Sequence, residues 1–353
     1  MEKKKDIMNL LKGICIFIML WSHSINNLSV NAPFDYFNIP LYRVYHTFTM
    51  PLFMMIAGYL FWYSLGKRTF VEAVTHRTRQ MLQPAIMCGT IVVLTYNLPK
   101  MLLKDGAAAL GTFLAEGVGV EPFTKYWFFW SALACSIVVA IMWKAFKKPF
   151  SRILGLILGV FLLCVFPSTE RSVYLYPFFA VAFVYHEYEP QIKEKLNKLR
   201  FVPLIVFPVL AVFYKKEHII DISGVKGDTV MATLSLNLFR WTVGLFGCLF
   251  VIVITRWAYD HLNKGFGVKV FDYLELMGKK SMQMYCIQLI VLEKWIALVF
   301  EKAVEVIGTN YLAIKGVYEL IVTPVSGFLV SLIVLWIIKW LEKKNLAGYI
   351  FGR

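Results

Sequence analysis

Ten apolar stretches of roughly membrane-spanning length constrain this chain more than any other feature of its sequence. A helix needs about 20 predominantly apolar residues to cross the hydrocarbon core of a bilayer. The stretches lie at residues 7–27, 44–65, 82–103, 126–146, 151–167, 172–187, 201–214, 233–256, 283–301 and 317–340. Hydrophobic residues make up 59% of the chain and charged residues 17%, too few to cover soluble domains with a polar surface. The sequence therefore predicts an all-α, polytopic membrane helix bundle of about ten transmembrane helices.

The placement of the basic residues predicts the topology. Of the 37 Lys and Arg residues, 25 fall on segments that share one side of the membrane when the N-terminus is placed inside. These segments are the N-terminus through residue 12, then 67–79, 144–152, 193–200, 256–280 and 339–353. Cytoplasmic loops carry such an excess, so both termini are expected in the cytoplasm. The net charge of +15 then reflects topology and anionic membrane lipids, and no nucleic acid is expected as a partner.

The chain contains no sequence repeat, low-complexity tract or linker that would separate domains. The first apolar stretch follows a basic leader, but no convincing small-residue cleavage site follows it, so we expect a retained helix. The six cysteines lie in or beside apolar stretches, without spacing typical of a metal site or a disulfide framework. These features predict a single integral membrane domain over 1–353, no separate soluble domain and no metal.

The first apolar stretch carries two ionisable residues, Lys12 and His23. Eleven residues at 100° each bring both side chains to nearly the same helix face, roughly 16 Å apart along the axis. Imidazole has an unperturbed pKa close to working pH, so His23 suits a general base. Alternatively, His23 is a buried histidine satisfied by a neighbouring helix, and Lys12 reaches to the interface. The other loop-proximal histidines, expected to face water, are His76, His186, His218 and His261.

A second group of ionisable residues lies in the predicted outer half of the membrane. Arg43 and His46 are three residues apart and share one helix face. Arg240 lies inside one span, and Glu293 and Lys294 lie inside another. Glu293 could orient His23 as the third member of a catalytic triad does, or form a salt bridge with Lys294 or Arg240.

Four segments, in order along the chain, resemble acyltransferase family 3, and especially its fucose 4-O-acetylase-like branch. The first is the Lys12-x10-His23 spacing within Leu-Lys-Gly-Ile. The second is FTMPLFMMIAGYL at 48–60, and the third is Arg-Thr-Arg at 77–79 before Pro84. The fourth is YWFFWSAL at 126–133, and GKKSMQMY at 278–285 is a weaker fifth match.

The chain departs from the family pattern at three positions. Asn9 stands where the family usually has Asp, and Thr49 replaces the His of the Phe-His-Met-Pro stretch. The family's later Tyr-x-x-His is Tyr285-x-x-Gln288 here. The assignment of His23 survives these changes, but no role carries over to Thr49 or Gln288.

The resemblance implies that Arg77 and Arg79 bind the phosphates of an acyl-coenzyme A donor at the cytoplasmic face, with Lys12 as a third contact. Guanidinium groups match phosphate oxygens well. The alternative is ordinary positive-inside charge, since residues two apart on a helix point about 200° apart. The resemblance also places Trp127 at the acceptor, which would enter from the outer side past Arg43 and His46.

The sequence thus predicts a membrane O-acyltransferase of the bacterial inner (plasma) membrane. It would move acetyl from cytoplasmic acetyl-CoA to a hydroxyl of a cell-envelope or exported polysaccharide sugar, directly or through an acyl-His intermediate. Its partners would be the acyl-CoA donor, a carbohydrate acceptor and membrane lipids. The alternative is a transporter or flippase of a lipid-linked glycan, which buried Arg, His and Glu residues would suit. Against it, the sequence shows no inverted repeat.

Overall fold

The computed structural model describes residues 6–29, 35–97, 124–164, 170–224, 227–292 and 315–352. Within these ranges the chain is helical and contains no strand. Its contacts divide it into two compact units, each assembled from separate parts of the chain. Unit 1 comprises residues 1–15, 37–77 and 131–278, and unit 2 comprises residues 16–36, 78–130 and 279–353.

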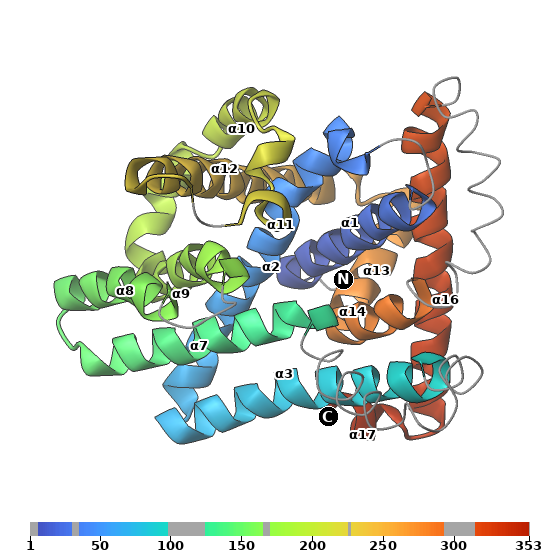
Figure 1. The fold of residues 1–353 in the computed structure, drawn as a ribbon, viewed down its shortest axis with the longest axis horizontal. Helices are drawn as coiled ribbons and strands as arrows, with labels where there is room; N and C mark the ends of the chain where they lie inside the picture. The colour runs from blue at the N-terminus through green and yellow to red at the C-terminus, as the bar shows by residue number, and fades with distance from the viewer. Residues whose placement is uncertain are drawn as a thin grey trace. The chain divides into compact units, whose positions relative to one another are not determined.

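Figure 1 shows the main helices, which overlap the predicted apolar stretches except for one helix at 266–279 that the sequence did not predict. They are α1 (Ile7–Ser29), α2 (Pro40–Lys67), α3 (Phe70–Val92), α7 (Trp127–Ala145), α8 (Pro149–Cys164), α9 (Glu170–Lys198), α10 (Val202–Val212), α12 (Val230–Leu262), α13 (Phe266–Lys279), α14 (Ser281–Ile290) and α16 (Thr323–Lys343). Shorter elements are η1 (Tyr36–Asn38), η2 (Val93–Asn97), η5 (Lys216–His218), α11 (Ile220–Ser223), η7 (Tyr318–Val322) and α17 (Ala347–Phe351).

Five helices in the described part of the chain are long and apolar enough to cross a membrane. They are Ile7–Asn26, Pro40–Lys67, Trp127–Ala145, Val230–Leu262 and Lys315–Lys343. Two more apolar helices, Pro149–Cys164 and Val202–Val212, are shorter. The prediction of a multi-pass, all-helical membrane protein is therefore confirmed. The number ten, the cytoplasmic termini and the single domain stay predictions.

Local sequence signals explain where several of these helices begin. Asp6 caps α1, because its carboxylate accepts from the backbone N–H of Met8 at 2.9 Å and from the side chain of Asn9 at 3.0 Å. The side chain of Thr229 caps α12 by accepting from the backbone N–H of Ala232 at 3.1 Å. Pro40 is the first residue of α2. Its missing backbone N–H costs nothing there, because the first N–H groups of a helix have no partner within the helix.

Glycine allows close helix crossings inside unit 1. A Cβ on Gly58 of α2 would lie 2.2 Å from the carbonyl oxygen of Phe179 on α9. Likewise, a Cβ on Gly13 of α1 would lie 1.9 Å from the carbonyl oxygen of Leu274, and one on Gly278 would lie 1.7 Å from that of Asn9. Two segments of the family resemblance, around residues 12 and 278, thus meet where α1 crosses α13 backbone to backbone. Small residues permit this kind of contact in membranes.

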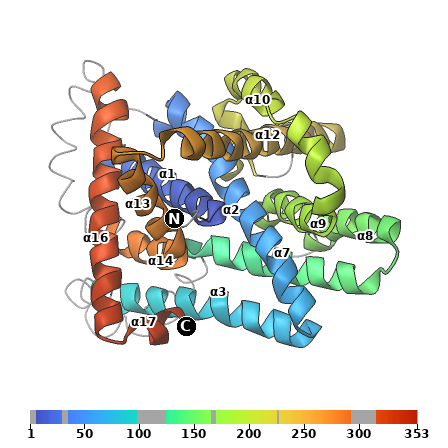
Figure 2. The same ribbon diagram turned by 180° about the vertical axis from the view of Figure 1, so that it is seen from behind.

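Unit 2 is held together by contacts between the C-terminal half of α1, α3, α14, α16 and α17. The indole Nε1 of Trp21 donates to the hydroxyl of Thr323 at 2.8 Å. At the other end of α16, Lys280 forms an ion pair with Glu342. The short α17 folds back onto α3, where the amide of Gln83 donates to the carbonyl of Tyr349 at 2.7 Å. Figure 2 shows α17 at the end of α16 and beside α3 from the opposite side.

Candidate functional site

The continuous helix α1 carries both Lys12 and His23, so the two residues keep the same-face spacing predicted from the sequence. Both side chains are half-buried. Ser24, next to His23, is 1% exposed, and its hydroxyl donates to the carbonyl of Leu20 at 2.9 Å. The Ser24 hydroxyl is therefore hydrogen-bonded within α1. The His23 imidazole projects from a regular helix.

Arg77 lies near the start of α3, before the predicted span 82–103, and its guanidinium is enclosed within unit 1. The Nε–H donates to the hydroxyl of Ser136 on α7 at 3.3 Å, and the guanidinium carbon lies 5.9 Å from the ring centre of Phe61 on α2. Ser136 is 1% exposed and donates its own proton to the carbonyl of Ala132 at 2.6 Å. The serine therefore accepts from Arg77 and holds the guanidinium in one orientation.

One end of the Arg77 guanidinium is left unsatisfied. Its Nη2 is buried and has no hydrogen-bond partner among the described residues. Burial lowers the pKa of Arg77 to about 10, and the nearby Cys135 thiol only partly opposes this effect. A buried cation with an open N–H is costly, and an anionic ligand would remove that cost. Arg77 therefore fits a phosphate group chemically.

Arg79 differs from Arg77 in its environment, because its side chain is exposed. The helix turns about 200° between the two positions, so they present to opposite sides of α3. The predicted difference in direction between the Arg77 and Arg79 side chains is confirmed. Whether either arginine binds a donor stays a prediction.

The predicted acceptor residues lie at the beginnings of helices. Arg43 and His46 occupy the first turns of α2, and both are half-buried. The His46 ring packs against Tyr42 at a tilt of 44°, with ring centres 4.5 Å apart. Trp127 is the first residue of α7 and packs near Phe128, with ring centres 6.1 Å apart. Their assignment to the acceptor remains a prediction.

Neither Glu293 nor Thr49 adds a contact to the described site. Glu293, with Lys294, lies outside the described residues, so its roles remain predictions. Thr49 is buried, and its hydroxyl donates to the carbonyl of Tyr45 at 2.7 Å within α2. Thr49 thus satisfies its own hydroxyl on its own helix, as expected for a residue to which no role was transferred.

Arg240 is completely buried in unit 1 and fully engaged by the chain itself. Its Nε donates to the carbonyl of His218 at 2.6 Å, and its Nη1 donates to the carbonyl of Gly224 at 2.7 Å. Its Nη2 donates to the hydroxyl of Ser223, and its Nη1 also donates to the side-chain Oδ1 of Asn237 at 3.4 Å. The guanidinium thus ties the segment around η5 and α11 to α12, which is a structural function.

The sequence transferred no role to Gln288, which has the most isolated polar side chain among the described residues of unit 2. Gln288 of α14 is 0% exposed, and neither its Nε2 nor its Oε1 finds a partner within the described ranges. Gln283, 3% exposed, also has an unsatisfied Oε1. Buried amides are nearly always hydrogen-bonded, so these atoms indicate a polar ligand. The detectable signal was a polar residue inside an apolar stretch, which was set aside because it departs from the family pattern.

The expectation that His186 faces water is wrong. It lies within α9, and both of its ring nitrogens are buried without a partner in the described structure. Its ring stacks on Trp62 with ring centres 4.4 Å apart and contacts Tyr59 and Tyr63 at 4.3 and 4.5 Å. The apolar stretch ends at residue 187, but α9 continues past it to Lys198. Within the part of the chain that the structure describes, no three His, Cys, Asp or Glu side chains cluster to hold a metal.

Several apolar helices with polar side chains enclosed among them define a multi-pass membrane protein. The chain belongs to acyltransferase family 3, since the family model described as an acyltransferase domain matches residues 6–340. It is similar to the nodulation protein NolL of Sinorhizobium fredii (strain NBRC 101917 / NGR234), with 29% identity over 208 residues, 57% of this chain and 54% of that protein.

A second relative is the nodulation protein NolL of Mesorhizobium japonicum (strain LMG 29417 / CECT 9101 / MAFF 303099). It is 25% identical over 180 residues, which cover 49% of this chain and 46% of that protein. The chain spans about half the length of the curated relatives it matches. No solved structure matches the chain.

Proposed function

We propose that this protein is a membrane O-acyltransferase that moves acetyl from cytoplasmic acetyl-CoA to a hydroxyl of a cell-envelope or exported polysaccharide sugar. Its location would be the bacterial plasma membrane. The family match over residues 6–340 supports the reaction class. The observation that supports acetyl-CoA as the donor is the enclosed Arg77 guanidinium, whose Nη2 has no partner among the described residues.

Arg77 would bind a phosphate of the donor through the open Nη2 while Ser136 holds the Nε. A charge-assisted contact to phosphate is stronger than a neutral hydrogen bond and is favoured away from water. The half-buried Lys12 and the exposed Arg79 would add positive charge, and solvent would screen the charge of Arg79 more strongly. The three residues thus have unequal roles in donor affinity.

His23 would act as the general base. Its imidazole takes the proton of the acceptor hydroxyl, and the oxygen attacks the thioester carbonyl to form a tetrahedral intermediate. The carbon–sulfur bond then breaks, and the imidazolium returns its proton to the departing thiolate, so atoms and charge balance. The alternative of an acetyl-His23 intermediate requires the same residue as nucleophile.

Gln288 would supply a hydrogen bond to the reacting groups. Its buried amide offers N–H donors and a carbonyl acceptor that no described residue uses. A preorganised donor directed at a developing oxyanion stabilises the transition state without reorganisation. An unsatisfied amide retained in an apolar helix is consistent with this function.

Turnover of labelled acetyl-CoA by the purified protein tests the proposal. His23→Ala should lower acetyl transfer to envelope glycan about 10²- to 10⁴-fold, the range typical of a lost general base. Its thermal unfolding should stay that of wild type. Ser22→Ala, one position away on α1, is the matched control and should retain activity. Equal turnover in His23→Ala and wild type would end the catalytic assignment, and absence of acetyl-CoA turnover in wild type would favour a transporter.

A further inference from the structure

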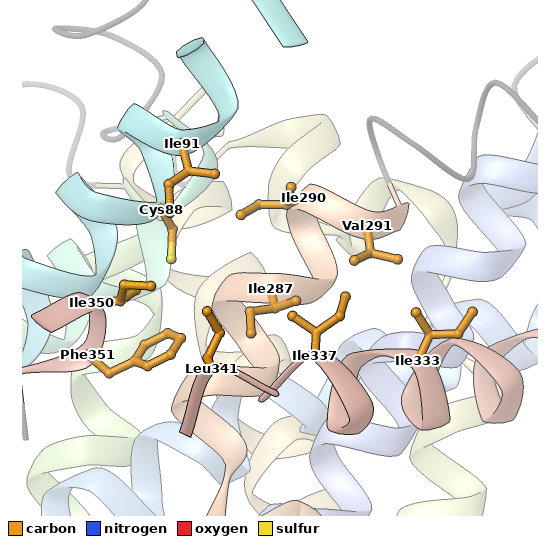
Figure 3. A pocket seen from close by; sticks show the side chains of 10 residues that line it. All are labelled: Cys88, Ile91, Ile287, Ile290, Val291, Ile333, Ile337, Leu341, Ile350 and Phe351. Atoms are coloured by element: carbon orange, nitrogen blue, oxygen red, sulfur yellow. The ribbon is translucent and has the colours of Figure 1, made fainter. Parts of the chain in front are cut away.

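An apolar cavity of about 570 Å³ lies within unit 2, between α3, α14, α16 and α17 (Figure 3). We refer to it as the C-terminal cavity. Nine of its ten lining side chains are hydrocarbon, and the tenth is the thiol of Cys88. Its volume falls in the range of about 300–1,000 Å³ found for small-molecule sites.

The shape of the C-terminal cavity follows one face of α16. Ile333, Ile337 and Leu341 are four residues apart, and Figure 3 shows their side chains in a row along that helix. Eight residues correspond to about 12 Å of helix length. Ile287 and Ile290 of α14 lie opposite them. The cavity is therefore an elongated groove.

The apolar lining of the C-terminal cavity determines which kind of ligand it can bind. A polar ligand would lose its water contacts and find no side-chain donor or acceptor beyond a weak thiol. Apolar cavities also hold no ordered water, because water needs several polar partners. A hydrocarbon chain satisfies both conditions.

One end of the groove carries the features of a membrane interface. The exposed Lys344 follows Leu341 by three residues and lies on the adjoining face, whereas the exposed Lys343 lies at the same level on the far side of α16. Trp340 is 47% exposed and Tyr349 is 74% exposed, as expected for aromatic side chains at headgroup level. Glu342 is held by Lys280, so this nearby carboxylate is neutralised. The groove therefore begins beside positive charge and continues into apolar surroundings.

We propose that the C-terminal cavity binds one acyl chain of an anionic phospholipid, whose headgroup phosphate lies against Lys344 while Lys343 adds positive charge at the same level. The apolar groove favours a hydrocarbon chain. The lysines favour a negatively charged headgroup, as juxtamembrane basic residues do. None of the lining side chains is one assigned to acyl transfer, so the lipid site does not rest on the proposed reaction.

Native mass spectrometry of the delipidated full chain tests the site with phosphatidylglycerol and phosphatidylcholine of identical chains. Wild type should retain one phosphatidylglycerol. Ile337→Trp, which fills the groove, should weaken its binding at least about tenfold. Leu332→Trp, an exposed position on another face of α16, is the matched control and should stay within about twofold. Lys343→Ala with Lys344→Ala should abolish the preference for phosphatidylglycerol.

Phosphatidylglycerol with a photoreactive group on its acyl chain provides a second measurement on the unaltered protein. It should crosslink to the peptide that carries Ile337 and Leu341, whether or not the Trp variant folds. Equal retention of both lipids by wild type and all folded variants would overturn the proposal. So would crosslinking elsewhere in the chain, or displacement by palmitoyl-CoA with no binding of either phospholipid, which would assign the groove to the donor.

Discussion

Unit 1 contains two enclosed arginines, and their surroundings differ. Arg240 donates to two backbone carbonyls, a hydroxyl and an amide oxygen, so the chain itself satisfies its guanidinium. Arg77 donates through its Nε to Ser136, and its buried Nη2 finds no partner among described residues. A protein keeps an unsatisfied buried donor only at a cost, whereas a satisfied one contributes to stability. Arg240 is therefore a structural anchor, and Arg77 is the arginine suited to a ligand.

The largest expected effect is on stability at Arg240. Arg240→Met should lower the free energy of unfolding by about 2–4 kcal/mol, because it leaves buried acceptors unpaired at about 1–3 kcal/mol each. Thermal unfolding in detergent or nanodiscs measures this. A variant as stable as wild type would contradict the structural assignment.

Arg77→Met should weaken donor binding without lowering stability. We expect the KM for acetyl-CoA to rise about 10- to 100-fold, since a hydrogen bond to a charged group contributes about 1.5–3 kcal/mol. Thermal stability should be unchanged or higher, because an unsatisfied buried charge has been removed. Arg79→Met on the same helix is the matched control, and its effect should be smaller because Arg79 is exposed. If Arg77→Met unfolds the protein and leaves donor affinity intact in surviving molecules, both arginines are structural.

Gln288→Leu extends the comparison to unit 2. Replacing an unsatisfied buried amide by a side chain of similar size should keep or raise the unfolding temperature. Turnover should nevertheless fall about tenfold, the value of one lost neutral hydrogen bond in the transition state. Rates and unfolding temperature measured on one preparation separate the two effects. Unchanged turnover in a stabilised variant would show that the amide has no role in the reaction.

Ser136→Ala should produce a weaker version of the Arg77 effect. The guanidinium keeps its charge but loses the hydroxyl that holds its Nε, so we expect the KM for acetyl-CoA to rise a few-fold at unchanged kcat. Ser151→Ala on α8, where the hydroxyl makes a solvent-exposed hydrogen bond to the carbonyl of Lys148, serves as the control. A rise in KM equal to that of Arg77→Met would mean that orientation, rather than charge, provides the affinity.

The smallest effect concerns His218, whose backbone carbonyl accepts from Arg240. Burial, and then the positive charge of Arg240, lower the pKa of the His218 imidazole below its usual 6.5. The folded state thus binds fewer protons than the unfolded state, so stability should fall as pH drops below about 6.5. Unfolding temperatures at pH 7.5 and 5.5 should show a shallower slope in His218→Gln. An identical slope in both proteins would contradict the coupling.

Local sequence rules were sufficient for the parts of the fold that depend on neighbouring residues. Hydrophobic runs predicted the helices, and the eleven-residue spacing placed Lys12 and His23 on one face of a single helix, because helical periodicity is a property of the backbone. The two-residue offset of Arg77 and Arg79 followed from the same geometry. The motifs around 48–60 and 126–133 indicated the family, which the match over 6–340 confirms.

The sequence alone could not distinguish the two enclosed arginines, since each is a basic residue in or beside an apolar stretch. Ser136 lies 59 residues from Arg77, and the carbonyl of His218 lies 22 residues from Arg240. No periodicity links such positions, and the decisive acceptors at Arg240 include backbone oxygens, which every residue type carries. The same holds for the stacking of His186 on Trp62 and for the isolation of Gln288. Local sequence determined which side chains are present on each helix, and only tertiary packing decided which of them are satisfied, because hydrogen-bond partners are fixed by distances in space.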